Sequence, residues 1–245
     1  MFSIFKKKSS SPLDLSWLGV DMHSHLLPGI DDGAQDMTAS MEYIRGLAAL
    51  GYKKIITTPH IYWEMYPNTA EIIKERWGDV KAELDATGIE IELEAAAEYF
   101  MDEHFHEELE KKIPLLPLKD NLVLVEFSMV NPPMDLHEVL FEMQMQNYQP
   151  VIAHPERYVS LKNKPGFFEE LHTKGYLFQL NLLSLTGYYG ETVQELAEFL
   201  AKKDMYSYAG TDLHHQRHLD KLQKLVASAS FRRLKDSGML KNHLL

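Results

Sequence analysis

Seven apolar stretches of strand length recur along the chain, and segments with a helical spacing of apolar residues separate them. The stretches are rich in Val, Ile, Leu, Phe, Tyr and Ala, and most are continuous apolar runs. Strands of a parallel sheet that are buried on both faces have this pattern. The predicted strands are Trp17–His23, Lys53–His60, Ile89–Tyr99, Asn121–Ser128, Gln149–Glu156, Tyr176–Ser184 and Tyr206–His214.

Three of the intervening segments each carry one apolar stripe, made of residues three or four apart, as in a helix that packs on a sheet. The stripes are Ile73, Trp77, Val80 and Leu84; Leu136, Val139, Leu140 and Met143; and Val193, Leu196, Ala197 and Leu200. Gly51, Gly88 and Gly175 stand just before predicted strands, where a glycine ends the preceding helix. The alternation of strands and helices predicts a βα repeat.

The βα repeat is predicted to form one domain over residues 15–245, because no linker or low-complexity stretch interrupts it. A closed or nearly closed βα barrel and an open doubly wound sheet both fit the pattern. The glycine-rich phosphate loop of many nucleotide-binding sheets is missing, which favours the barrel. Residues 1–14 are predicted to be a flexible extension. A weak peripheral membrane anchor through Phe2, Ile4 and Phe5, beside three lysines, is the alternative for its first part.

Composition narrows the classes of function. The 245 residues include 25 Lys and Arg against 36 Asp and Glu, a formal net charge of −11. This balance argues against an extended nucleic-acid interface, because phosphate contacts need clustered cations. The absence of cysteine excludes disulfides, thiolate zinc sites and a cysteine nucleophile. No apolar run approaches the ~18–20 residues of a membrane span, and we expect a cytoplasmic protein without a secretory signal.

Metal-binding side chains gather at the C-terminal ends of six of the seven predicted strands. Active sites of βα barrels are built at this end. One such residue is ordinary, but a converging set of buried charges is costly unless the charges are paired or bound to metal. The residues are His23 and His25, which lie two apart and point the same way, His60, Glu98, Glu126, His154, Asp212 and His214.

The donor set is a mixture of imidazole and carboxylate without sulfur, which suits manganese, iron or zinc. Eight or more donors exceed the needs of a single ion and indicate two or three divalent ions. Such a cluster activates water near neutral pH and clamps a phosphoryl group. The remaining histidines are not predicted to be ligands: His104, His106, His137 and His172 in helical segments, His215 and His218 after the last strand, and His243 near the C-terminus.

Six motifs together resemble the polymerase and histidinol phosphatase (PHP) superfamily: DMHSHLLPGIDDGA, TTPH, AAAEYF, LVEFS, VIAHPERY and AGTDLH. Within it, the chain most resembles the bacterial tyrosine phosphatases of capsular and exopolysaccharide operons, from Val20 to near the C-terminus. The resemblance implies a distorted seven-stranded βα barrel with a trinuclear metal centre, often dependent on manganese.

The ligand sets that the resemblance implies share Glu98 as a bridge. They are His23, His25, Glu98 and Asp212 for a first ion; Glu98, Glu126 and His154 for a second; and His60, His214 and an aspartate for a third. Asp31 and Asp32 are both candidates for that aspartate. Asp212 and His214 are also assigned to the catalytic set.

Arg157 is the candidate for binding the phosphoryl group. It lies three residues after His154, past a proline that turns the chain over the rim. Its guanidinium can give a phosphoryl oxygen bidentate hydrogen bonds. The alternative is a surface ion pair with Glu156 or Asp135. Related phosphatases often have arginine or polar residues after the histidine of the second strand. Here apolar and aromatic residues follow, which leaves the substrate contacts of that loop open, with Tyr62 as the candidate.

The resemblance implies a metal-dependent protein-tyrosine phosphatase that acts by a metal-activated hydroxide. The implied substrate is a phosphotyrosine protein, the C-terminal tail of a bacterial tyrosine kinase that regulates polysaccharide synthesis. Two alternatives remain open at this point. One is a phosphatase of a small phosphomonoester such as histidinol phosphate, and the other is a non-catalytic binding module stabilised by metal.

Overall fold

The computed structural model describes residues 12–245 of the chain. Most of the predicted N-terminal extension, including the three apolar residues of the possible anchor, lies outside the described residues. Leu13 is buried, and its backbone N–H donates to the Gln223 side chain (3.2 Å). The packed part of the chain therefore includes Leu13, which the sequence had assigned to the flexible extension over residues 1–14. None of the helices in residues 12–245 has both the length and the apolar character required to cross a membrane.

The described residues form nine strands and eight α-helices, and every pair of neighbouring strands is parallel. The strands are β1 (Val20–Asp21), β2 (Lys54–Thr57), β3 (His60–Ile61), β4 (Glu92–Ala95), β5 (Glu98–Phe100), β6 (Leu122–Glu126), β7 (Gln149–Ala153), β8 (Leu177–Asn181) and β9 (Tyr206–Gly210). The helices are α1 (Met37–Ala49), α2 (Ala70–Thr87), α3 (Glu103–Glu110), α4 (Leu136–Met145), α5 (Pro165–Thr173), α6 (Glu191–Lys202), α7 (Gln216–Leu222) and α8 (Ala229–Ser237).

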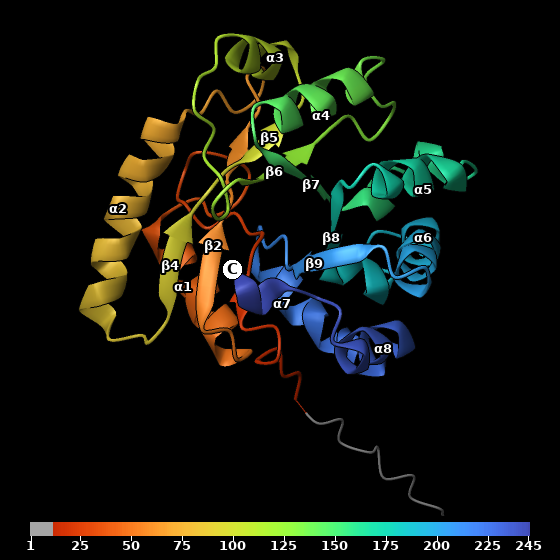
Figure 1. The fold of residues 1–245 in the computed structure, drawn as a ribbon. Helices are drawn as coiled ribbons and strands as arrows, with labels where there is room; N and C mark the ends of the chain where they lie inside the picture. The colour runs from red at the N-terminus through yellow and green to blue at the C-terminus, as the bar shows by residue number, and fades with distance from the viewer. Residues whose placement is uncertain (1–11) are drawn as a thin grey trace, which may run out of the picture.

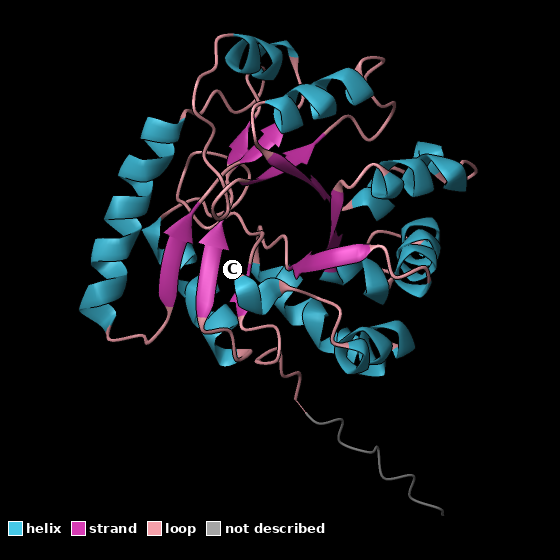
Figure 2. Ribbon diagram, in the orientation of Figure 1, coloured by secondary structure: helices cyan, strands magenta, loops and turns pink. Residues whose placement is uncertain are grey.

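The predicted parallel α/β architecture is confirmed, and its strands lie around a common centre with the helices outside them (Figures 1 and 2). The apolar stripes predicted on α2, α4 and α6 face the core, with most of their residues buried. Gly51, Gly88 and Gly175 follow α1, α2 and α5 with φ of 99°, 69° and 87°, a left-handed conformation that glycine adopts readily.

The strands form two sheets, of order β1-β2-β4 and β3-β5-β6-β7-β8-β9, and not one closed seven-stranded sheet. Two of the predicted strands are each broken in two, into β2 and β3 and into β4 and β5. The second break lies at Ala96 and Ala97. The first lies at Thr58 and Pro59, and proline has no N–H to donate to a ladder. The pairing resumes immediately after it, where the Glu98 N–H donates to the Pro59 carbonyl (3.1 Å).

Side chains join β1 to β9, which are not sheet neighbours in the described part of the chain. The buried Asn242 amide donates to the carbonyls of Val20 (3.0 Å) and Ala209 (2.6 Å) and accepts from the Ala209 N–H (3.0 Å). Further along, the Asp21 carboxylate accepts from the backbone N–H and the hydroxyl of Thr211, both at 2.8 Å. These bonds keep the ends of β1 and β9 together, and the segments that follow both strands carry predicted ligands.

Candidate metal centre

The segments that follow β1 and β9 lie side by side at the C-terminal end of the strands. The His25 N–H donates to the Leu213 carbonyl (2.9 Å), and the Asp212 N–H donates to the His23 carbonyl (2.7 Å). This pairing brings the first and last motifs of the sequence into one site, as the strand-end argument predicts.

Glu98 lies at the centre of the site and is fully buried. Its Oε2 atom is 3.1 Å from His23 Nε2, 3.2 Å from His60 Nδ1 and 3.4 Å from His25 Nε2. Its Oε1 atom is 3.1 Å from His154 Nε2. One carboxylate thus faces four imidazoles, three through Oε2 and one through Oε1. This arrangement can present one oxygen to each of two cations.

Four overlapping groups of donor atoms occur among the described residues, and within each group the atoms lie within 4.8 Å of one another. The groups are His25, Asp32, His60 and His214; His23, His154 and Asp212; His23, His25 and Glu98; and His60, Glu98 and Glu126. Imidazole and carboxylate donors without sulfur fit manganese, iron or zinc. The other histidines of the described chain belong to none of these groups.

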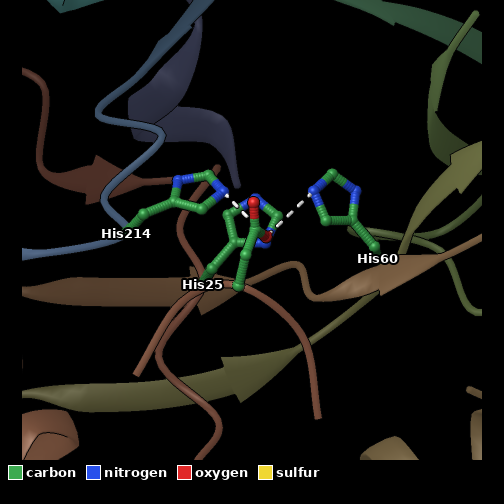
Figure 3. A group of neighbouring side chains, drawn as sticks. His25, His60 and His214 are labelled. Atoms are coloured by element: carbon green, nitrogen blue, oxygen red, sulfur yellow. Dashed lines mark ion pairs between the residues drawn. The ribbon is translucent and has the colours of Figure 1, made fainter. Parts of the chain in front are cut away.

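Asp31 and Asp32 have different surroundings. The Oδ1 atom of Asp32 lies 3.4 Å from His214 Nε2 and 3.6 Å from His60 Nε2, and Figure 3 shows the rings of His60 and His214 on either side of His25. Asp31 is buried behind the His25 ring, with its Oδ2 atom 2.8 Å from Nδ1. The structure therefore brings Asp32 into a donor group and leaves Asp31 to orient His25.

Glu126 lies near two histidines that the resemblance had assigned to different ions. Its Oε1 atom is 3.2 Å from His60 Nδ1, and its Oε2 atom is 3.6 Å from His154 Nε2. His60 therefore faces both the group with Asp32 and the group with Glu98 and Glu126.

The carboxylates and imidazoles of the site shift one another's pKa. Burial alone would raise the pKa of Glu98, but His23 and His60 hold it well below its usual value. Burial alone would lower the pKa of His23, but Glu98 and Asp212 raise it to about 9. In the metal-free protein, the ionised Glu98 and the protonated His23 therefore stabilise each other's charge. A metal ion must therefore displace protons from the imidazoles when it binds.

We expect opposite effects of pH on the stability of the metal-stripped and the metal-loaded protein. The pKa of His23 is raised from 6.5 to about 9 in the fold, so its contribution to stability is fully present below pH 6.5 and is lost as the pH rises through 9. Metal-dependent stabilisation grows over the same range, because ligation needs neutral imidazoles. Melting temperatures from pH 6 to 9.5, with chelator and with Mn²⁺, test this. If the melting temperature changed with pH in the same way with chelator and with Mn²⁺, these residues would not bind the metal.

The β8 strand supplies two buried side chains that the sequence analysis missed. The Gln179 Oε1 atom lies 2.8 Å from His23 Nδ1 and accepts from the His154 N–H (3.2 Å). The Asn181 amide donates to Asp212 Oδ2 (2.7 Å). A partner at His23 Nδ1 leaves Nε2 free to ligate a metal. The available signal was two polar residues within the apolar run of the sixth predicted strand.

Two residues of the site have strained backbones. His154 has φ of 32°, and Asp212 has φ of 49°, both in the left-handed region that is uncommon for residues other than glycine. Such strain persists only where the surroundings impose it, and it is concentrated at functional sites. Residues outside the site also have positive φ, namely Lys112, Asp120, Asn147 and Asp204. The backbone at the ends of β7 and β9 therefore agrees with a functional site but does not mark it by itself.

Arg157 reaches into the site and does not form either of the predicted surface ion pairs. Its Nη1 atom donates to Asp212 Oδ2 (2.9 Å), and its guanidinium lies 4.8 Å from the centre of the Tyr189 ring. The two alternative partners are engaged elsewhere. Asp135 pairs with His106 (3.4 Å), and Glu156 is fully buried.

The site opens into a pocket of about 480 Å³. Its lining includes the buried Glu98 and Glu126, the partly exposed Arg157, and aromatic side chains, among them the predicted substrate contact Tyr62. The pocket therefore combines buried carboxylates with aromatic side chains.

The family model for capsular polysaccharide synthesis proteins, CpsB/CapC, matches residues 19–234. The chain belongs to the CpsB/CapC family. It is 29% identical to the tyrosine-protein phosphatase YwqE of Bacillus subtilis over 197 residues, which is 80% of this chain and 77% of YwqE. It is 28% identical to the tyrosine-protein phosphatase CpsB of Streptococcus pneumoniae over 202 residues, 80% of this chain and 83% of that relative.

Solved structures agree with membership in the CpsB/CapC family. A structure described with YwqE and CpsB as metal-dependent tyrosine phosphatases matches with a TM-score of 0.77 and 27% identity, over 91% of this chain and 94% of that chain. The histidinol phosphate phosphatase of Lactococcus lactis matches with a TM-score of 0.54, over 94% of both chains. At 14% identity, this second likeness shows a shared fold alone. The resemblance stated from the sequence motifs is confirmed.

Proposed function

We propose that this chain is a metal-dependent protein-tyrosine phosphatase. The observation that carries the proposal is the Glu98 carboxylate facing four imidazoles in a pocket that Arg157 also lines. The names of the family relatives YwqE and CpsB as tyrosine phosphatases support the substrate class. The proposed substrate is a phosphotyrosine protein of capsular or exopolysaccharide synthesis, the C-terminal tail of a tyrosine kinase, in the cytoplasm.

Two to three divalent ions are the proposed cofactors, with manganese first and iron or zinc as alternatives. The proposed ligands are His23, His25, Asp32, His60, Glu98, Glu126, His154, Asp212 and His214. They sit on a distorted seven-stranded barrel, in which β2 with β3 and β4 with β5 each count as one strand. Asp31 is not among the proposed ligands, because its carboxylate faces Nδ1 of His25, whereas Nε2 of that ring faces Glu98.

The ions supply Lewis-acid activation of water and neutralise charge on the phosphoryl group when they are bound. Arg157 binds a phosphoryl oxygen from the pocket side, since its guanidinium is held there by Asp212 and Tyr189. Asp212 in turn is fixed by Asn181, so its other oxygen keeps its direction toward His23 (3.4 Å). Gln179 holds His23 in one orientation. These residues therefore preorganise the charges that the transferred phosphoryl group meets.

Turnover of two substrates by the manganese-loaded full chain tests the proposal. We expect kcat/KM for a phosphotyrosine peptide to exceed that for histidinol phosphate by at least ~10-fold, since aromatic side chains line the pocket. The reverse preference would assign the chain to small phosphomonoesters. Absence of turnover of both, with metal bound, would favour a binding module.

A further inference from the structure

Two aromatic side chains lie beyond Glu98 and His60 in the direction of the strands, at the level of Glu126. Along β5, Glu98 and Phe100 both line the pocket. Tyr99 between them is buried in the hydrophobic core that the strands share with the helices, which we call the outer core. Residues two apart in a strand point to the same face. Phe100 therefore stands on the same face as Glu98, one pleat further along the strand.

The neighbouring strand β3 and the residue that follows it repeat this arrangement. His60 and Tyr62 line the pocket, and Ile61 between them is buried in the same outer core. The register pairs His60 with Glu98, which places Tyr62 beside Phe100. Their rings stack with centroids 4.0 Å apart and an angle of 12° between the planes. The two segments thus present a tier of donors and, beyond it, a flat aromatic pair.

The separation of the two tiers matches the geometry of an aryl phosphate. Two residues of a strand advance by about 6.6 Å, which is close to the distance from a phosphoryl group to the far side of its own phenyl ring. On β6, Glu126 is the register partner of Phe100, so a second carboxylate also lies beside the aromatic tier. The ester ring of a phosphoryl group bound at the donors therefore has the length to reach Tyr62 and Phe100.

The turn that carries Tyr62 is held in place before any ligand binds. Tyr62 and Tyr66 exchange backbone hydrogen bonds (3.1 and 2.6 Å), and the Tyr66 ring stacks on His60 at 5.4 Å. Between them, Trp63 points away from the pocket and stacks on His104 (4.0 Å). A surface that is already ordered loses little conformational entropy on binding, so its contacts contribute more to affinity.

We propose that Tyr62 and Phe100 are specificity-determining residues that contact the ring of an aryl phosphate monoester and favour it over an alkyl one. This inference rests on the proposed function and assigns its substrate preference to two side chains. Tyr62 was a candidate substrate contact from its sequence position alone. Phe100 joins it because its ring on β5 stacks on the ring of Tyr62, the residue that follows β3.

Binding of two phosphonates to the manganese-loaded full chain tests the proposal without turnover. Phenylphosphonate presents a ring and methylphosphonate does not, and titration calorimetry gives both dissociation constants. We expect the wild type to bind phenylphosphonate at least ~10-fold more tightly, as aromatic contacts and ring burial predict. Tyr62→Leu and Phe100→Leu should each reduce that preference ~3-fold or more, with the affinity for methylphosphonate and the metal content unchanged.

Trp63→Leu is the matched control, since Trp63 belongs to the same turn but stacks outside the pocket. It should leave both affinities unchanged. The proposal is overturned if the wild type shows no preference for the phenyl ligand. It is also overturned if Tyr62→Leu and Phe100→Leu leave the preference intact, or if Trp63→Leu lowers it equally.

The failure of this inference and that of the proposed function are distinguishable. A wild-type protein that hydrolyses phosphotyrosine peptides while both leucine variants keep the full phenyl preference refutes only the roles of Tyr62 and Phe100. A wild-type protein that binds phenylphosphonate selectively but hydrolyses no phosphotyrosine peptide refutes only the proposed function.

Discussion

Replacing Glu98 by glutamine is expected to release bound metal and to lower kcat by at least ~10²-fold. The substitution keeps the shape of the side chain but removes the charge at the point where four imidazoles converge. Disturbing the ligand environment of a metal costs about 10–100-fold in affinity or activity even one layer away from the ion. A residue that is itself shared between two ions has a larger effect. Elemental analysis and kcat from a single preparation measure both effects.

Glu94→Gln is the matched control for Glu98→Gln. Glu94 lies on β4, half-exposed, pairs with Lys54 (2.9 Å) and belongs to none of the four donor groups. Exposed pairs contribute ~0–1 kcal/mol to stability, so this change should leave metal content and kcat unaltered. Equal behaviour of the two variants would show that Glu98 is an ordinary buried acid.

Arg157→Lys is expected to lower kcat/KM by ~10-fold or more while metal content and melting temperature stay unchanged. Lysine keeps the charge but loses the planar fork that can grip a phosphoryl oxygen and the stacking on Tyr189. Asp212 keeps its hydrogen bond from Asn181 in the variant, so its place in the site is preserved. The measurement is kcat/KM for a phosphotyrosine peptide and for a small aryl phosphate.

The comparison of substrates shows what Arg157 contacts. An arginine that binds the phosphoryl group matters for both substrates, whereas one that binds the peptide matters for the first alone. Arg217→Lys is the control, because its exposed guanidinium lies 5.7 Å from the Tyr188 ring and does not line the pocket. A change of less than twofold for Arg157→Lys would assign Arg157 to a structural ion pair with Asp212.

The elements and the donor residues could be predicted from the sequence because both leave local patterns. Apolar runs and helical stripes record which faces are buried, and the stripes of α2, α4 and α6 are buried as predicted. Donor residues at strand ends converge because parallel strands bring their C-terminal ends to one edge.

The division into two sheets and the contacts between residues far apart in the sequence could not be predicted, because periodicity does not identify a strand's neighbours. Pro59 was visible, but its effect on the sheet depends on where the ladder resumes, at the Glu98 N–H. The choice between Asp31 and Asp32 depends on the geometry of the loop that carries them. The loop directs Asp31 toward Nδ1 of His25 and Asp32 toward His60 and His214. Gln179 acts through His23, a contact between residues 156 positions apart that no local pattern records.

Metal content measured together with hydrolysis of a phosphotyrosine peptide, before and after chelation, tests the central claim most directly. The account predicts two to three divalent ions per chain, loss of hydrolysis when they are removed, and its return on addition of Mn²⁺. Fewer than two ions per chain, or hydrolysis that is indifferent to the chelator, would contradict it.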